Sequence, residues 1–121
     1  MSTGSEEKLG TLKISDDVIA VCTMNATQKT KGVAGLSGVF SDNLSKNLFG
    51  KEPLYKGIKV NQSDEGISID IYIIVEYGVK IPEVAWDIQE NVKNEVESMT
   101  EAVVKAVNIH VQGVHFTDEE D

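Results

Sequence analysis

The stretch ISIDIYIIVEY, from Ile67 to Tyr77, decides the fold, because apolar and other side chains alternate along it almost without a break. Successive side chains of a β-strand point to opposite faces, so the odd-numbered residues of this stretch share one face. The other face carries Ser68, Asp70, Tyr72, Ile74 and Glu76. This pattern predicts an antiparallel strand with one buried face.

The segments next to this strand continue a regular pattern. Upstream, Gly57–Asn61 alternates in the same way and Ser63–Gly66 consists of residues that favour turns, so a hairpin is predicted. Downstream, Gly78 ends the strand, and Pro82 occupies a place that the first turn of a helix tolerates. At helical spacing one apolar stripe follows: Ile81, Val84, Ala85, Ile88, Val92, Val96 and Met99.

The N-terminal half is less regular. Residues 10–14 alternate briefly and predict a short edge strand. Ser15 then begins a helix that is expected to run to Lys29 and to end at Gly32. The apolar face of this helix holds Val18, Ile19, Cys22 and Ala26. Glycines after it allow a short strand or turn, and a short helix is predicted over residues 41–50.

The last part of the chain returns to a period of two after Thr100. Val107, Ile109 and Val111 alternate with polar residues and predict a final strand, in which Gly113 marks a bulge or bend. The predicted fold class is therefore α+β, in the order (β)-α-(β)-β-β-α-β. A small mixed or antiparallel sheet carries the two main helices on one face.

The composition bounds the domain organisation and the class of protein. With 121 residues, 40% of them hydrophobic, the chain can form one core. We expect a disordered N-terminus over residues 1–8, a single domain over 9–116 and an acidic tail over 117–121. Cys22 is the only cysteine, which fits a reducing compartment, and no apolar run is long enough to span a membrane. These features predict a cytoplasmic protein.

The charge argues against nucleic acid and membrane surfaces as direct partners. The net charge is −9, and all eleven basic residues are lysine. Phosphate groups are bound by cationic surfaces, and bidentate contacts favour arginine. One feature points the other way: Gly32-Val33-Ala34-Gly35 matches the Gly-x-x-Gly loop of KH RNA-binding domains, and two lysines precede it. A simple turn after a helix explains the same four residues.

Residues that could carry chemistry are few. Cys22 lies on the apolar helix face, where a buried, inert thiol is favoured over a nucleophile. His110 and His115 are expected on opposite faces of the last strand unless Gly113 shifts the alternation, and two histidines make a weak zinc site. Asp70 and Glu76 are too far apart for a close acid pair. We therefore predict no enzymatic activity, no metal and no cofactor.

A candidate protein-interaction surface lies on the long helix. Trp86 falls among polar residues, away from the apolar stripe, and tryptophan is enriched at interfaces. The acids opposite the stripe are Glu83, Asp87, Glu90, Glu97 and Glu101. Tyr72 and Ile74 form a second apolar spot on the outer face of the sheet. Two alternatives stay open: Trp86 folds over the helix edge onto Lys93 and nearby loop residues, and residues 36–55 cover the second spot.

Several spaced segments together carry a resemblance to a known family. They read YKGIKV (55–60), IVEYG (74–78), IPEVA (81–85), QENVK (89–93), VESMT (96–100) and VNIHVQGV (107–114), with GTLKI (10–14) and GVAG (32–35) upstream. This distributed pattern resembles the alkaline shock protein family of Gram-positive bacteria over residues 9–116.

The resemblance implies an intracellular, non-enzymatic protein linked to cell-envelope and alkaline stress. Relatives of this kind include abundant proteins that self-associate and proteins held at the membrane by a small membrane-anchored partner. We therefore expect a protein-binding or scaffold module, at the inner face of the membrane only through such a partner. A KH-like RNA-binding domain is the alternative. A third hypothesis is an enzyme or ligand-binding domain with a pocket between the first helix and residues 39–53.

Overall fold

The computed structural model describes residues 10–37 and 57–116 of the chain. Six elements lie in these ranges: α2 (Asp16–Lys29), β1 (Val33–Leu36), β2 (Ile58–Ser63), β3 (Gly66–Glu76), α4 (Ile81–Thr100) and β4 (Val104–His115). The predictions for residues 1–8, 41–50 and 117–121 fall outside the described residues.

Strand β3 is the centre of a mixed four-stranded sheet. It pairs in parallel with β4, and antiparallel with both β1 and β2. β2 pairs with the first half of β3 and β1 with the last part of it, so β1 and β2 follow one another along the same edge. The junction lies at Tyr72, whose N–H donates to Gly57 O (2.8 Å) and whose carbonyl accepts from Ser37 N (2.7 Å).

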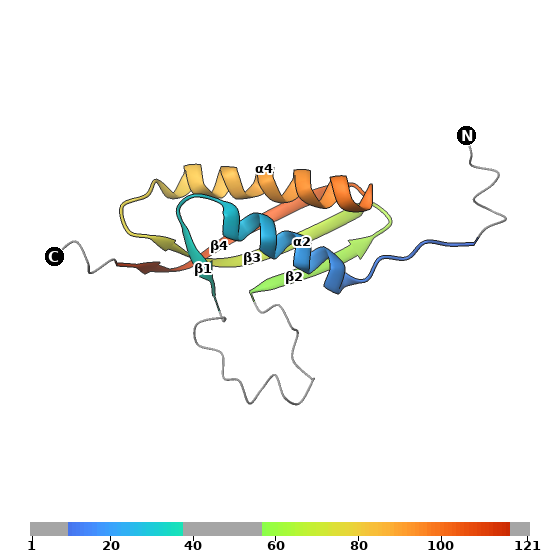
Figure 1. Cartoon of the computed structure of the whole chain (residues 1–121), viewed down its shortest axis with the longest axis horizontal. Helices are drawn as coiled ribbons and strands as arrows, with labels where there is room; N and C mark the ends of the chain where they lie inside the picture. Colours follow the sequence, from blue (N-terminus) through green and yellow to red (C-terminus); the bar gives the residue numbers. More distant parts are fainter. Residues whose placement is uncertain (1–9, 38–56, 117–121) are drawn as a thin grey trace, which may run out of the picture.

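Both helices cover one face of this sheet, as Figure 1 shows, and no described helix covers the other face. The core lies between these layers. The odd-numbered residues of β3 from Ile67 to Val75 are buried, as the alternation predicted. From the helices, Ile19 of α2 and Ile88 of α4 are fully buried against them. The predicted α+β class, with two helices on one sheet face, is confirmed.

Helix α2 begins where its sequence predicts. Ser15 is the N-cap, and its side-chain oxygen accepts a hydrogen bond from Val18 N (3.3 Å). The buried face of α2 includes Ile19, Cys22 and Ala26, together with threonines whose hydroxyl groups donate to carbonyls one turn back. Val18, predicted on this face, is instead 43% exposed, because it lies in the first turn, before the stretch that packs on the sheet.

Helix α4 has a shorter buried stripe than predicted. Val84, Ile88, Val92 and Val96 are buried, which is one residue per turn at spacing four. Ile81 and Met99, predicted at the two ends of this stripe, are exposed, because the first and last turns extend past the packed middle of the helix. Tyr77, predicted on the buried strand face, is exposed as well, since β3 ends at Glu76 and Tyr77 belongs to the turn.

The predicted edge strand over residues 10–14 is not formed. This segment is held by a side chain instead of a strand ladder: Gln62 Nε2 of β2 donates to Ile14 O (3.0 Å) and to the Asp16 carboxylate (2.8 Å). The predicted bulge near Gly113 is confirmed. Ile73 lies opposite Val111 and Ile74 opposite Gly113, so Gln112 is an extra residue in β4.

Candidate protein-interaction site

Trp86 lies in a groove between the outer side of α4 and strand β4. Its side chain is 61% exposed even though it belongs to a helix that packs on the core. We call this hollow, of about 360 Å³, the α4–β4 groove. It is lined by Trp86, Gln89, Glu90, Lys93, Val104, Lys105, Ala106, Val107 and Asn108. Trp86 therefore shares a surface with Lys93, as one alternative proposed, but most of its area stays open to an interaction partner.

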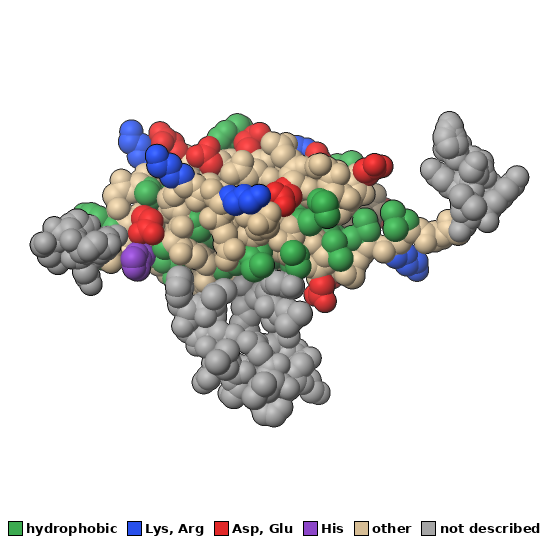
Figure 2. Space-filling view, viewed as in Figure 1, with side chains coloured by type: hydrophobic (Ala, Val, Ile, Leu, Met, Phe, Trp, Pro, Cys, Tyr) green, Lys and Arg blue, Asp and Glu red, His purple; other side chains and the backbone are tan. Residues whose placement is uncertain are grey.

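The predicted acidic residues of α4 fall into two groups. Glu83, Asp87 and Glu90 are exposed and form no ion pair with any described residue. In Figure 2 acidic side chains are spaced along the side that carries α4, whereas hydrophobic ones gather over the first half of α2. These three carboxylates are free to meet a basic partner.

Glu97, the fourth predicted acid, has a structural role instead. Its carboxylate accepts a hydrogen bond from Lys93 Nζ (2.8 Å) and another from Val104 N (2.9 Å) at the start of β4. The hydrogen bond from Lys93, followed by that from Val104, lowers the pKa of Glu97. Glu97 thus joins the end of α4 to the first residue of the next strand. Sequence spacing could not reveal this, because the Val104 contact depends on how the connection folds back.

Tyr72 and Ile74 lie on the opposite side of the sheet from Trp86, so the predicted site residues form two separate surfaces. Tyr72 stacks on the ring of His110, with 4.3 Å between ring centres, and the Lys59 ammonium lies 5.6 Å from the Tyr72 ring centre. Ile74 packs near Gly113, which leaves room for its side chain. We refer to this side, which no helix in residues 10–37 or 57–116 covers, as the open sheet face.

Both histidines lie on the open sheet face, because the bulge at Gln112 shifts the alternation of β4. His110 Nε2 is 3.0 Å from Asp70 Oδ1, and His115 Nδ1 is 3.0 Å from Glu76 Oε1. The hydrogen bond with His110 is the main cause of a lowered pKa of Asp70. Sequence analysis left Asp70 and Glu76 without partners, although the parallel register of β3 and β4 brings each close to a histidine. Residues 10–37 and 57–116 contain no group of three metal-ligating side chains.

Two other predicted features are clearly placed by the structure. Cys22 is buried, as predicted; burial raises the pKa of its thiol, and the negative charge of Glu95 raises it further. The Gly32–Gly35 stretch is not an open loop: Val33–Leu36 forms β1, which pairs with β3. The glycines therefore lie in and beside a paired strand, where backbone groups are engaged by the sheet.

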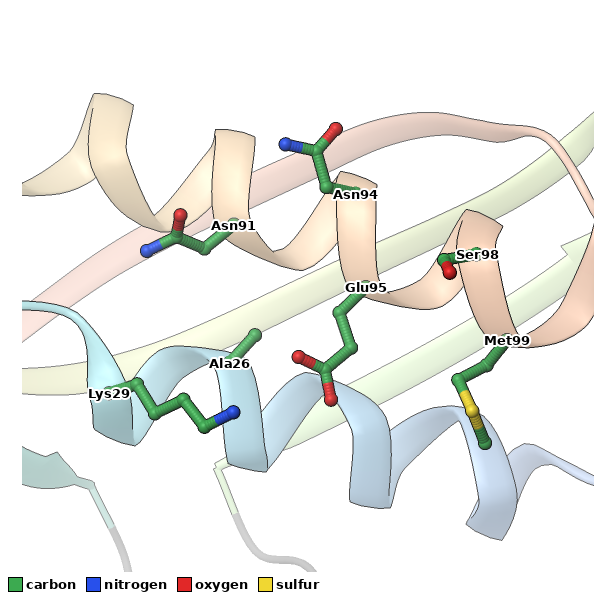
Figure 3. A pocket seen from close by; sticks show the side chains of 7 residues that line it. All are labelled: Ala26, Lys29, Asn91, Asn94, Glu95, Ser98 and Met99. Atoms are coloured by element: carbon green, nitrogen blue, oxygen red, sulfur yellow. The ribbon is translucent and has the colours of Figure 1, made fainter.

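A second hollow, of about 530 Å³, lies between α2 and α4. Figure 3 shows Lys29 of α2 and Glu95 of α4 reaching into it, while Asn94 turns away. Glu95 accepts a hydrogen bond from Asn25 Nδ2 (2.8 Å), which ties the two helices together. The predicted pocket between the first helix and residues 39–53 involves residues outside the described ranges.

Comparison with known proteins settles the family. The sequence model of the alkaline shock protein 23 family, described as having a cell envelope-related function, matches residues 4–116. The chain belongs to this family. The resemblance seen in the spaced sequence segments is therefore confirmed, and a cell envelope-related function comes with the family.

Several relatives in this family are similar over most of the chain. YqhY of Bacillus subtilis is 39% identical over 108 residues, which are 89% of this chain and 79% of that protein. YloU, also of Bacillus subtilis, is 39% identical over 120 residues and covers 98% of this chain and 99% of its own. A Streptococcus pyogenes protein named as a stress response regulator gls24 homolog is 30% identical over 102 residues, 84% of this chain and 57% of its own length.

Among solved structures, a C-terminal domain of MamM matches with a TM-score of 0.49 and 13% sequence identity, over 82% of this chain and 99% of that one.

No helix in residues 10–37 or 57–116 is both long and apolar enough to cross a membrane.

Proposed function

We propose that this family member is a non-enzymatic protein-binding module, and that its outer α4 surface around Trp86 binds other proteins at the cell envelope. One observation carries the proposal: a tryptophan that is 61% exposed stands beside three carboxylates without a described partner. Exposed tryptophan is costly in water and common at the centre of interfaces. The family's cell envelope-related description supports an envelope role.

The partner class in this proposal is a small membrane-anchored protein, with a second copy of the chain as a further partner. A membrane-anchored partner would hold the module peripherally at the inner face of the membrane. The exposed acids Glu83, Asp87 and Glu90 favour a partner that presents basic groups.

The test is crosslinking and pull-down from native cells with the wild-type chain, Trp86→Ala and Glu90→Lys. Met99→Ala is a matched control, because Met99 is 65% exposed on the same helix but lines the hollow beside α2. We expect both test variants to lose the wild-type partners and the control to keep them. Equal capture by all four proteins would show that this surface is not the interface.

A further inference from the structure

Strand β4 has an edge that no described strand pairs with. It has 12 residues, and β3 occupies one edge along nearly all of its length. Proteins usually protect a long edge by charges, proline, bulges or a covering element. In β4 the register shifts only near its two ends, at Lys105 and Gln112, and runs regularly from Ala106 to Val111. This middle stretch is a regular, open strand edge.

The backbone groups that face this edge follow from the pairing of β3. Tyr72 N and Glu76 N donate to the β1/β2 side. The backbone N–H and C=O groups of the odd-numbered residues of β3 therefore point sideways toward β4. Ile69 lies opposite Val107 in the parallel register, which turns the backbone N–H and C=O of Val107 away from β3. A contact from the helix agrees: Gln89 Nε2 donates to Val107 O (3.0 Å).

The same alternation turns the backbone groups of Ile109 and Val111 to the free edge. Their side chains pack against the core, so the residues are fixed in place while their outer N–H and C=O groups stay available. The α4–β4 groove runs beside the start of this edge, with Trp86 as its wall. An exposed strand edge beside a helix is the geometry in which an extended peptide adds to a sheet.

Charge selects among the possible occupants of the groove. The two lysines that line it are already paired: Lys93 with Glu97 at 2.8 Å, and Lys105 with Glu65 at 3.0 Å. Glu90 in the groove wall has no ion-pair partner among the described residues. A second copy, itself with a net charge of −9, would bring another acidic helix to this wall, whereas a basic segment would be attracted.

We propose that an extended segment of a partner protein, bearing lysine or arginine, docks in the α4–β4 groove and adds a strand to the free edge of β4. This rests on the proposed function and specifies its binding mode and the chemistry of its partner. The N–H of Val107 and the backbone groups of Ile109 and Val111 hydrogen-bond the added strand, while Val107 O keeps its hydrogen bond from Gln89 Nε2. Trp86 covers one of its apolar side chains, and Glu90 meets one of its basic groups.

The probe is a capped, fluorescein-labelled octapeptide of alternating valine and lysine, with binding followed by fluorescence anisotropy at low salt. We expect saturable binding, and at least about tenfold weaker binding when glutamate replaces lysine. Amide NMR signals of Val107, Ile109 and Val111 are expected to shift most. Trp86→Ala is expected to weaken binding, whereas Met99→Ala is not.

Two N-methylated versions of the peptide test strand addition itself. One is methylated at every valine nitrogen and the other at every lysine nitrogen, so each blocks one edge of the added strand. Because only one edge pairs with β4, one version is expected to bind at least about tenfold more weakly than the other. Equal affinity of the two versions, or no binding of the parent peptide, overturns the inference.

The outcomes separate this inference from the proposed function. If Trp86→Ala loses its cellular partners but the two methylated peptides bind alike, strand addition fails and the proposed function stands. If Trp86→Ala keeps its partners, both fail. A dimer that Trp86→Ala abolishes and the peptide does not dissociate would identify a second copy as the occupant and overturn the choice of a basic segment.

Discussion

Three glycine-to-alanine substitutions should separate two sources of backbone constraint in this fold. Gly113 has no positive φ, and a Cβ there would meet only Ile74 at 3.8 Å, an ordinary contact. Gly78 has φ +97° with nothing within 4 Å of such a Cβ. Gly57 has φ +87°, and its Cβ would lie 2.6 Å from Ser37 O. Gly78→Ala therefore introduces backbone strain alone, whereas Gly57→Ala introduces strain together with a backbone clash.

The expected losses of unfolding free energy follow this order. A left-handed φ costs an alanine about 1 kcal/mol, which is the expected loss for Gly78→Ala. At Gly57 the clash with a backbone oxygen that cannot rotate away adds about 2 kcal/mol, for a total of about 3 kcal/mol. Gly113→Ala should be neutral or stabilising by about 0.5 kcal/mol, since it reduces the freedom of the unfolded chain.

The assay is urea unfolding followed by far-ultraviolet circular dichroism, with the m-value checked for each variant. In thermal unfolding of the same variants, the melting temperature should fall by about 4 °C for Gly78→Ala and by about 12 °C for Gly57→Ala. Equal losses at Gly57 and Gly78 would refute the clash with Ser37 O. A loss above about 1 kcal/mol for Gly113→Ala would refute the conclusion that a Cβ fits at Gly113 without strain.

Further predictions concern single groups. Glu101→Gly should raise the unfolding free energy by about 1 kcal/mol, because Glu101 has φ 62° at the end of α4; a lower melting temperature would contradict this. His110→Ala should raise the pKa of Asp70 toward its usual value, as measured by carbon NMR. Since the lowered pKa belongs to the folded state, ionised Asp70 stabilises the fold at neutral pH, and this contribution is lost as pH falls through that pKa. Cys22 should react with a thiol reagent only as fast as the chain unfolds, because it is 5% exposed and its pKa is raised; rapid reaction of the native protein would refute its burial.

The sequence predicted the elements whose pattern is local. Alternation in β3 and the four-residue spacing of Val84, Ile88, Val92 and Val96 each reflect one buried face, so they can be read from neighbours along the chain. Ile81 and Met99 were misplaced, because a stripe of apolar residues says nothing about where the packed partner surface stops. The same reason applies to Tyr77, which the alternation includes although the strand has already ended.

The candidate site was predicted only in part, because its geometry depends on contacts between distant segments. The position of Trp86 away from the apolar stripe follows from its angle on the helix and was predicted, whereas its exposure was one of two alternatives left open. The histidine partners of Asp70 and Glu76 depend on sheet register, and the hydrogen bond from Val104 N to Glu97 depends on how the chain after α4 folds back. Both register and the path of a connection are set by the whole fold, so these features needed the structure.

The junction at Tyr72 makes β1 and β2 behave as one strand with an interruption. The last hydrogen bond before the interruption and the first one after it both use the backbone of this one residue. The sheet therefore holds Ser37 and Gly57 against the same residue of β3. A change in the backbone at Tyr72 would thus loosen the end of β1 and the start of β2 together.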